Sequence, residues 1–181
     1  MLWSRLFPSR RSDNRNAAAA LYRALVAQAR RPVFYAAYGV PDTLDGRFDL
    51  IALHMFAILY RLKAETGAAG LSQDLFDTMF ADMDRSLREM GVGDLGVGRR
   101  VRAMAEALYG RMAAYEAGLA ADDATLSAAL RRNLYGSLGA DAPAAGAALC
   151  AYVRSSVRNL AGQSVEQLRT GNVTFPEVPP V

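Results

Sequence analysis

The chain has 181 residues, a single cysteine and a net charge of +3 at pH 7. A chain of this length can bury one core without metal or disulfides, and the lone Cys150 excludes an internal disulfide. The whole charge excess lies in residues 1–15, so residues 16–181 are neutral in balance, which argues against a specific nucleic-acid-binding domain.

The N-terminal tail, residues 1–15, mixes apolar and basic side chains without the long apolar run that a signal peptide requires. Two interpretations stay open: the tail lies on an anionic membrane surface, or it is a chain end without a function. Under the first interpretation, the predicted membrane contacts are Trp3, Leu6, Phe7, Arg5, Arg10 and Arg11.

A helix is predicted over residues 17–31, ended or kinked by Pro32, and a short aromatic helical turn and a loop follow it. Asp42 or Thr43 then caps the most apolar helix, residues 48–62. This helix is apolar on nearly every side but shorter than the roughly 20 residues that span a bilayer, so we expect it at the centre of the fold. Its His54, the only histidine, is predicted to be packed, neutral and hydrogen-bonded.

Residues 75–119 predict a helical hairpin. Its first helix starts at Ser72 or Asp74 and ends at Gly91, and its charged side offers the ion pairs Asp84/Arg88 and Arg85/Glu89. The apolar seam of this helix is predicted at Phe76, Phe80, Met83, Leu87 and Met90. The stripe of the second helix is predicted at Val97, Val101, Met104, Leu108, Met112, Tyr115 and Leu119.

The turn of this hairpin contains a G-x-G-x-x-G pattern at Gly91, Gly93 and Gly96. A dinucleotide site needs a strand before these glycines, whereas here a helix precedes them, so a tight connection is the better interpretation. Asp94 is predicted to cap the second helix. A weaker anion site at its start, helped by nearby arginines, stays open.

Two more helices are predicted. Asp122 or Asp123 caps the first, and Asp141 with Pro143 opens the last, which runs to about residue 169. Residues 170–181 form an extended tail that either crosses the body or hangs free. No strand-like alternation occurs, so we predict an all-α, single-domain bundle of about six helices, with the body at residues 16–169.

No recognisable arrangement of catalytic residues occurs, and the carboxylates of Asp77, Asp82 and Asp84 are neutralised by neighbouring arginines. The sequence therefore predicts no enzyme, no metal site and no cofactor. The methionine-rich seams instead suit the binding of varied apolar segments. The competing interpretation is a small-ligand carrier or enzyme with a pocket near His54.

Two stretches, YGVPDTLDGRFDLIALHMF (38–56) and LFDTMFADMDRSLREMGVGDLGVGRRVRAMAEALYGR (75–111), resemble the ubiquinol-cytochrome c chaperone family. The resemblance covers about residues 35–134. It implies an assembly chaperone that holds newly made cytochrome b for respiratory complex III. With the alanine and arginine bias, it suggests a bacterial member that is cytoplasmic or peripheral on the inner face of the plasma membrane. The sequence alone decides neither ribosome nor small-subunit contact.

An apolar groove between the central helix and the hairpin is the predicted site for cytochrome b or another apolar membrane-protein segment. The predicted client-binding residues are Phe76, Met79, Phe80, Met83, Leu87, Met104, Leu108, Arg85, Arg88, Arg99, Arg100 and Arg102.

Overall fold

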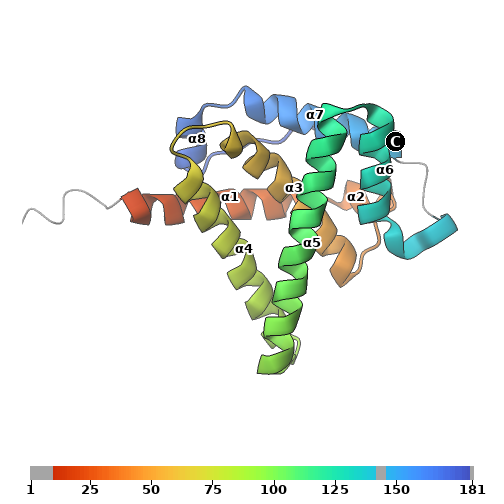
Figure 1. Cartoon of the computed structure of the whole chain (residues 1–181), viewed down its shortest axis with the longest axis horizontal. Helices are drawn as coiled ribbons and strands as arrows, with labels where there is room; N and C mark the ends of the chain where they lie inside the picture. Colours follow the sequence, from red (N-terminus) through yellow and green to blue (C-terminus); the bar gives the residue numbers. More distant parts are fainter. Residues whose placement is uncertain (1–9, 142–145, 180–181) are drawn as a thin grey trace, which may run out of the picture.

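The protein is built from helices that surround one central helix (Figure 1). The computed structural model describes residues 10–141 and 146–179. Within these ranges no strand occurs, and the predicted all-α fold is confirmed. The elements are, in chain order, α1 (Arg10–Ala29), α2 (Pro32–Ala36), α3 (Leu44–Lys63), α4 (Ala69–Glu89), α5 (Asp94–Ala120), α6 (Asp123–Leu134), the 3-10 helix η2 (Gly136–Asp141), α7 (Gly146–Ala161) and α8 (Val165–Arg169).

Helix α3 lies at the centre, as its sequence predicts. Every residue from Phe48 to Leu59 is buried, and α3 contacts α1, α4, α5, α6 and α7. Thr43, not Asp42, caps it, because the Thr43 side chain accepts a hydrogen bond from the Gly46 amide at 3.2 Å. A helix that is apolar on every side is stable here because neighbouring helices cover each side.

Helices α4 and α5 form the predicted hairpin, whose turn extends away from the other helices (Figure 1). Gly91 ends α4 with a φ of +81°, a left-handed conformation that glycine adopts without strain. The predicted stripe of α5 is confirmed in part: Val97, Leu108 and Tyr115 are buried, and Met104, Met112 and Leu119 pack partly buried against the core. Near its end, α5 approaches α6 closely: a Cβ atom on Gly118 would lie 2.6 Å from the Leu126 Cα atom.

The buried face of α4 includes Met83 and Leu87 of the predicted seam, but in the first half of the helix it is shifted by one position. Leu75 and Met79 are buried, whereas Phe76 and Phe80 are half-buried, because α4 packs against α1 and turns the phenylalanines toward α5. The spacing of apolar residues fits either register, so periodicity could not distinguish them. Met90, predicted in the seam, is 52% exposed at the end of the hairpin.

Two local predictions about the helix starts of the hairpin are wrong. Helix α4 begins at Ala69, so neither Ser72 nor Asp74 starts it. Gly93 is the N-cap of α5, and no side chain caps this helix; Asp94 pairs instead with Arg88.

The ion pair Asp84/Arg88 is present, but Arg85 pairs with Asp82 rather than Glu89. Asp82 is partly withdrawn from solvent because the Tyr22 hydroxyl donates a hydrogen bond to it at 2.9 Å. It therefore acts as a link between α4 and α1.

The C-terminal part was predicted as one helix but forms two, α7 and α8, because the chain breaks at Gly162 and restarts with a capping box at Ser164 and Gln167. Pro143, predicted to open this helix, lies outside the described residues. The tail after α8 crosses the body: the Tyr38 hydroxyl donates to the Pro179 carbonyl at 2.8 Å. Residues up to 179 therefore lie against the body and do not hang free.

Helix α1 already begins at Arg10, within the segment assigned to the N-terminal tail. The predicted membrane contacts Trp3, Arg5, Leu6 and Phe7 lie outside the described residues, as do the side chains of Arg10 and Arg11. Among the helices of the described ranges, none combines the length and apolarity needed to span a bilayer.

Candidate functional site

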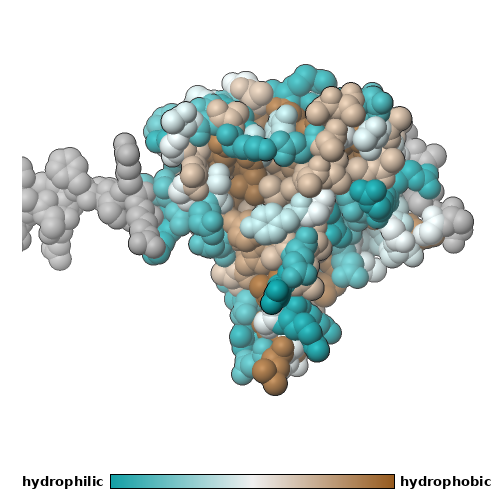
Figure 2. Space-filling model, in the orientation of Figure 1, coloured by the Kyte–Doolittle hydropathy of each residue, from teal (hydrophilic) through white to brown (hydrophobic). Residues whose placement is uncertain are grey.

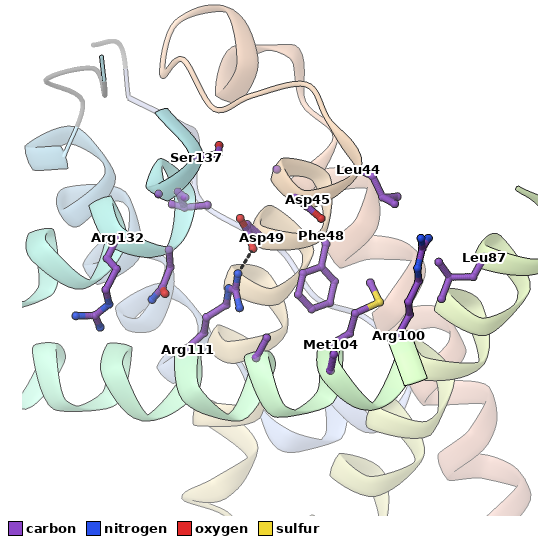
Figure 3. A pocket seen from close by; sticks show the side chains of 16 residues that line it. Leu44, Asp45, Phe48, Asp49, Leu87, Arg100, Met104, Arg111, Arg132 and Ser137 are labelled. Atoms are coloured by element: carbon purple, nitrogen blue, oxygen red, sulfur yellow. Dashed lines mark hydrogen bonds and ion pairs between the residues drawn. The ribbon is translucent and has the colours of Figure 1, made fainter. Parts of the chain in front are cut away.

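An open groove of about 610 Å³ lies between the start of α3, the middle of α5 and the end of α6 (Figure 3). We call it the α3–α5 groove. It is lined by Leu44, Asp45, Gly46, Phe48, Asp49, Leu87, Arg100, Ala103, Met104, Ala107, Arg111, Arg132, Asn133, Leu134, Gly136 and Ser137. A groove between the central helix and the hairpin, as the sequence predicts, is therefore present.

The walls of the α3–α5 groove are mainly apolar. Met104 of α5 and Phe48 of α3 lie next to each other in the groove (Figure 3). Ala103 and Ala107 of α5 also line it. Leu44, at the first turn of α3, is 48% exposed at the edge. Small alanines and a flexible methionine leave room for side chains of varied shape, which is the surface that an apolar segment needs.

A buried ion pair forms one end of the groove. Arg111 Nη2 donates to Asp49 Oδ1 at 2.5 Å, and the guanidinium lies 5.5 Å from the centre of the Phe48 ring (Figure 3). Burial raises the pKa of the Asp49 carboxyl to about 6, although Arg111 acts in the opposite direction. Arg111 Nε is buried and has no hydrogen-bond acceptor among the described residues.

The groove carries a small positive excess. Arg100, Arg111 and Arg132 line it, against Asp45 and Asp49. Arg100 is exposed at the end nearest the hairpin turn, and Arg132 is exposed on α6. This arrangement of an apolar trough with basic side chains around it suits an apolar helix whose flanks carry carbonyl or carboxylate oxygens.

His54 is a packed residue, as predicted, and lies away from the groove. Its Nδ1 donates to the Leu50 carbonyl at 2.7 Å, because a carbonyl can only accept. Its Nε2 therefore accepts from the Tyr152 hydroxyl at 2.8 Å. The rings of Phe34, Tyr152 and Phe175 pack around the imidazole, and His54 is only 1% exposed.

Burial lowers the pKa of His54 to about 4, below its ordinary value of 6.5. The unfolded chain therefore takes up a proton first as the pH falls, and His54 contributes stability above pH 6.5 that is lost toward pH 4. We expect the free energy of unfolding of the wild type, relative to His54→Gln, to fall by about 3 kcal/mol across this window. Urea denaturation of both proteins at several pH values measures this, and a difference that does not change with pH would contradict it.

The structure brings three of the predicted client-binding residues to the groove: Leu87, Arg100 and Met104. Others are core residues, since Met79 and Leu108 are fully buried and Met83 is 8% exposed. On the other side of the hairpin, Phe76 stacks against Tyr109 at 5.4 Å between ring centres, with Phe80 beside it. Arg85 and Arg88 are held in ion pairs on α4, and Arg99 and Arg102 are exposed on the first turns of α5.

Sequence reasoning missed most of the groove, including Phe48, Asp49, Ala103 and Arg111. One signal was available: Asp49 is the only carboxylate in the apolar run of residues 48–59 and therefore requires a partner, and Arg111 is that partner. The contribution of α6 and η2 had no signal in the sequence, because it depends on how α6 folds back beside α5.

Comparisons with known proteins agree with the resemblance noted in the sequence. The family described as ubiquinol-cytochrome C chaperone matches residues 36–175. The ubiquinol-cytochrome-c reductase complex assembly factor 1 of Xenopus laevis is 32% identical over 162 residues, which cover 88% of this chain and 80% of that protein. The mouse protein of the same name is 29% identical over 162 residues, 88% of this chain but only 54% of its own length.

A solved structure has the same fold. The crystal structure of the Cbp3 homolog from Brucella abortus superposes with a TM-score of 0.81 and 39% sequence identity, covering 92% of both chains. At this identity and coverage, the arrangement of helices described here is shared along nearly the whole of both chains.

Proposed function

Because the chain belongs to the ubiquinol-cytochrome c chaperone family, we propose that it assists assembly of ubiquinol-cytochrome c reductase, respiratory complex III, by holding its cytochrome b subunit. The family is one of assembly chaperones and not of enzymes. The chain spans about half the length of the mouse relative, so the partners of that longer protein come to this chain only as part of the proposal.

The single observation that carries the proposal is the α3–α5 groove. Its apolar side chains can shield one face of a client helix, with anchors at every third or fourth position of that helix. The basic side chains of Arg100 and Arg132 lie around the trough and can hold the client's polar flanks. The buried predicted residues, such as Met79 and Leu108, act by shaping the hairpin and do not touch the client.

The groove volume suits a few side chains of one helix face and not a whole helix, whose diameter is about 10 Å. The client would therefore be held along one face and released when a better-fitting surface in the assembling complex covers that face. Such a transient hold requires moderate affinity, which an open groove provides.

Deletion of the gene tests the function. We expect the spectroscopic signal of the b-type cytochrome of complex III to fall strongly in the deletion strain and to return when the wild-type gene is supplied. The control is a terminal oxidase, an enzyme that does not contain this cytochrome b subunit. Its amount should be the same in the deletion strain and the wild type. Normal b-type cytochrome and normal complex III in the deletion strain would contradict the proposed function.

A further inference from the structure

The end of the α4–α5 hairpin exposes apolar side chains that no part of the described chain covers. Leu95 is 95% exposed, the most exposed large hydrophobic side chain of the described residues, and Met90 is 52% exposed nearby in the sequence. Figure 2 shows apolar surface at this end of the molecule, beside hydrophilic surface. We call Met90 to Gly96 the hairpin tip. Because the hairpin extends away from the body (Figure 1), the tip can reach a flat surface without a clash from other helices.

Basic side chains stand directly behind the hairpin tip. Arg99, Arg100 and Arg102 are exposed on the first turns of α5, and among the described residues Arg99 and Arg100 have no carboxylate partner. Arg102 pairs with Glu106. We call these three arginines the basic collar. Residues 84–102 contain five arginines, including the collar, and three carboxylates, so this segment carries an excess of positive charge.

Two of the three carboxylates in this region share one arginine as their ion-pair partner. Arg88 binds both Asp84 and Asp94, which leaves Glu89 as the third. Asp94 lies in the tip next to Leu95, so its pairing with Arg88 lowers the repulsion that an anionic surface would meet there. The face that the tip presents is therefore apolar at its end and positive behind.

The distances along α5 fit an interface between lipid and water. A helix rises 1.5 Å per residue, so the collar residues lie roughly 6 to 10 Å behind Leu95 along the axis. Side chains of a helix lean toward its N-terminus, which for α5 is the tip. With Leu95 at the level of the first acyl carbons, the guanidinium groups would lie among the headgroup phosphates, since interfacial elements insert about 5–10 Å.

We infer that the hairpin tip docks on an anionic lipid bilayer, with Leu95 and Met90 entering the interface and the basic collar binding lipid phosphates. Arginines bind phosphate through paired N–H donors, and a basic patch next to apolar side chains is attracted to anionic lipids. Arg100 also lines the α3–α5 groove (Figure 3), so docking would place one end of the groove beside the membrane that contains the client. This contact is separate from the N-terminal tail.

Vesicle co-sedimentation tests the inference with the full chain. The probes are vesicles of phosphatidylcholine mixed with phosphatidylglycerol, and vesicles of phosphatidylcholine alone. We expect the wild type to bind the anionic vesicles, and Leu95→Ser to weaken this binding about tenfold. Arg99→Gln with Arg102→Gln should weaken it about 25-fold at low salt and less at high salt, because each arginine near such a surface contributes about fivefold.

The matched control is Arg23→Gln with Arg158→Gln, which changes the net charge by the same amount at exposed positions on α1 and α7. It should bind almost as the wild type does. Equal losses in the control and in the collar variant would overturn the inference, because they would show a response to net charge alone. Full binding by Leu95→Ser, or no binding of the wild type to anionic vesicles, would also overturn it. Circular dichroism confirms that the variants remain folded.

Discussion

Ala103→Trp should reduce the b-type cytochrome of complex III to about a tenth of the wild-type level when it replaces the chromosomal copy. Ala103 is an exposed residue of the groove wall on α5, so an indole at this position fills the trough with little effect on the core. If the indole removes client contacts worth about 1.4 kcal/mol of binding free energy, the affinity of the groove for the client falls tenfold. The measurement is the difference spectrum of membranes, together with the amount of the variant protein in the cell.

Ala113→Trp is the matched control for this variant. Ala113 is an exposed alanine of the same helix, and about two and a half turns separate it from Met104, so it lies on the side of α5 away from the groove. It should support wild-type levels of complex III. If both tryptophan variants assemble complex III alike, the groove does not hold the client.

Arg111→Met should lower the free energy of unfolding by about 3 kcal/mol near pH 7.5, because it leaves the buried Asp49 carboxylate without its partner. The loss should be smaller near pH 5. The pKa of Asp49 is already raised to about 6 in the folded protein, and without Arg111 it rises further. At pH 5 the folded variant therefore carries a neutral Asp49, and the cost of an unpaired charge disappears.

The sign of the Asp49 effect is opposite to that of His54. A carboxyl with a raised pKa binds its proton more tightly in the folded state, so its contribution to stability falls as the pH rises from about 4 to 6. The double variant Asp49→Asn with Arg111→Met should recover most of the lost free energy of unfolding at neutral pH. Arg102→Met, an exposed change on the same helix, should leave the free energy of unfolding almost unchanged. Denaturant titration gives these values, and equal losses for Arg111→Met at both pH values would contradict the interpretation.

Some features of the fold depend on residues within one segment of the chain, and these were predictable from the sequence. Helix α3 has apolar residues on all sides, and only a central position covers them all. Gly91 had to end α4, because few other residues adopt its positive φ without strain. Asp122 caps α6 through a hydrogen bond from the Thr125 amide at 2.7 Å, one of the two alternatives that the sequence left open.

Other features depend on contacts that a sequence pattern does not contain. Leu75, and not Phe76, is the inner residue of α4 because α1 packs on one edge of the broad apolar face of α4. The sequence does not show whether residues 171–179 hang free, because the contacts of Tyr38 and Phe175 that hold them against the body are tertiary. The last predicted helix divides at Gly162, where a restart at Ser164 was not recognised.

The position of the groove was predicted, but only part of its lining was. Met-rich seams and basic residues pointed to a groove beside the hairpin, and Leu87, Arg100 and Met104 do line it. Its far wall comes from Leu134 and the turn after it, which reach the groove only through tertiary packing of α6 on α5. Alanines such as Ala107 carry no chemical signal, although their small size creates the space.

Site-specific photocrosslinking from position 103, in cells that are assembling complex III, determines whether the α3–α5 groove holds the client. A photoreactive amino acid at position 103 faces the α3–α5 groove, and the same amino acid at position 113 faces away from it. The account predicts that mass spectrometry identifies cytochrome b in the crosslinked product from position 103 and not in that from position 113. Capture of no cytochrome b from position 103, or equal capture from both positions, would contradict it.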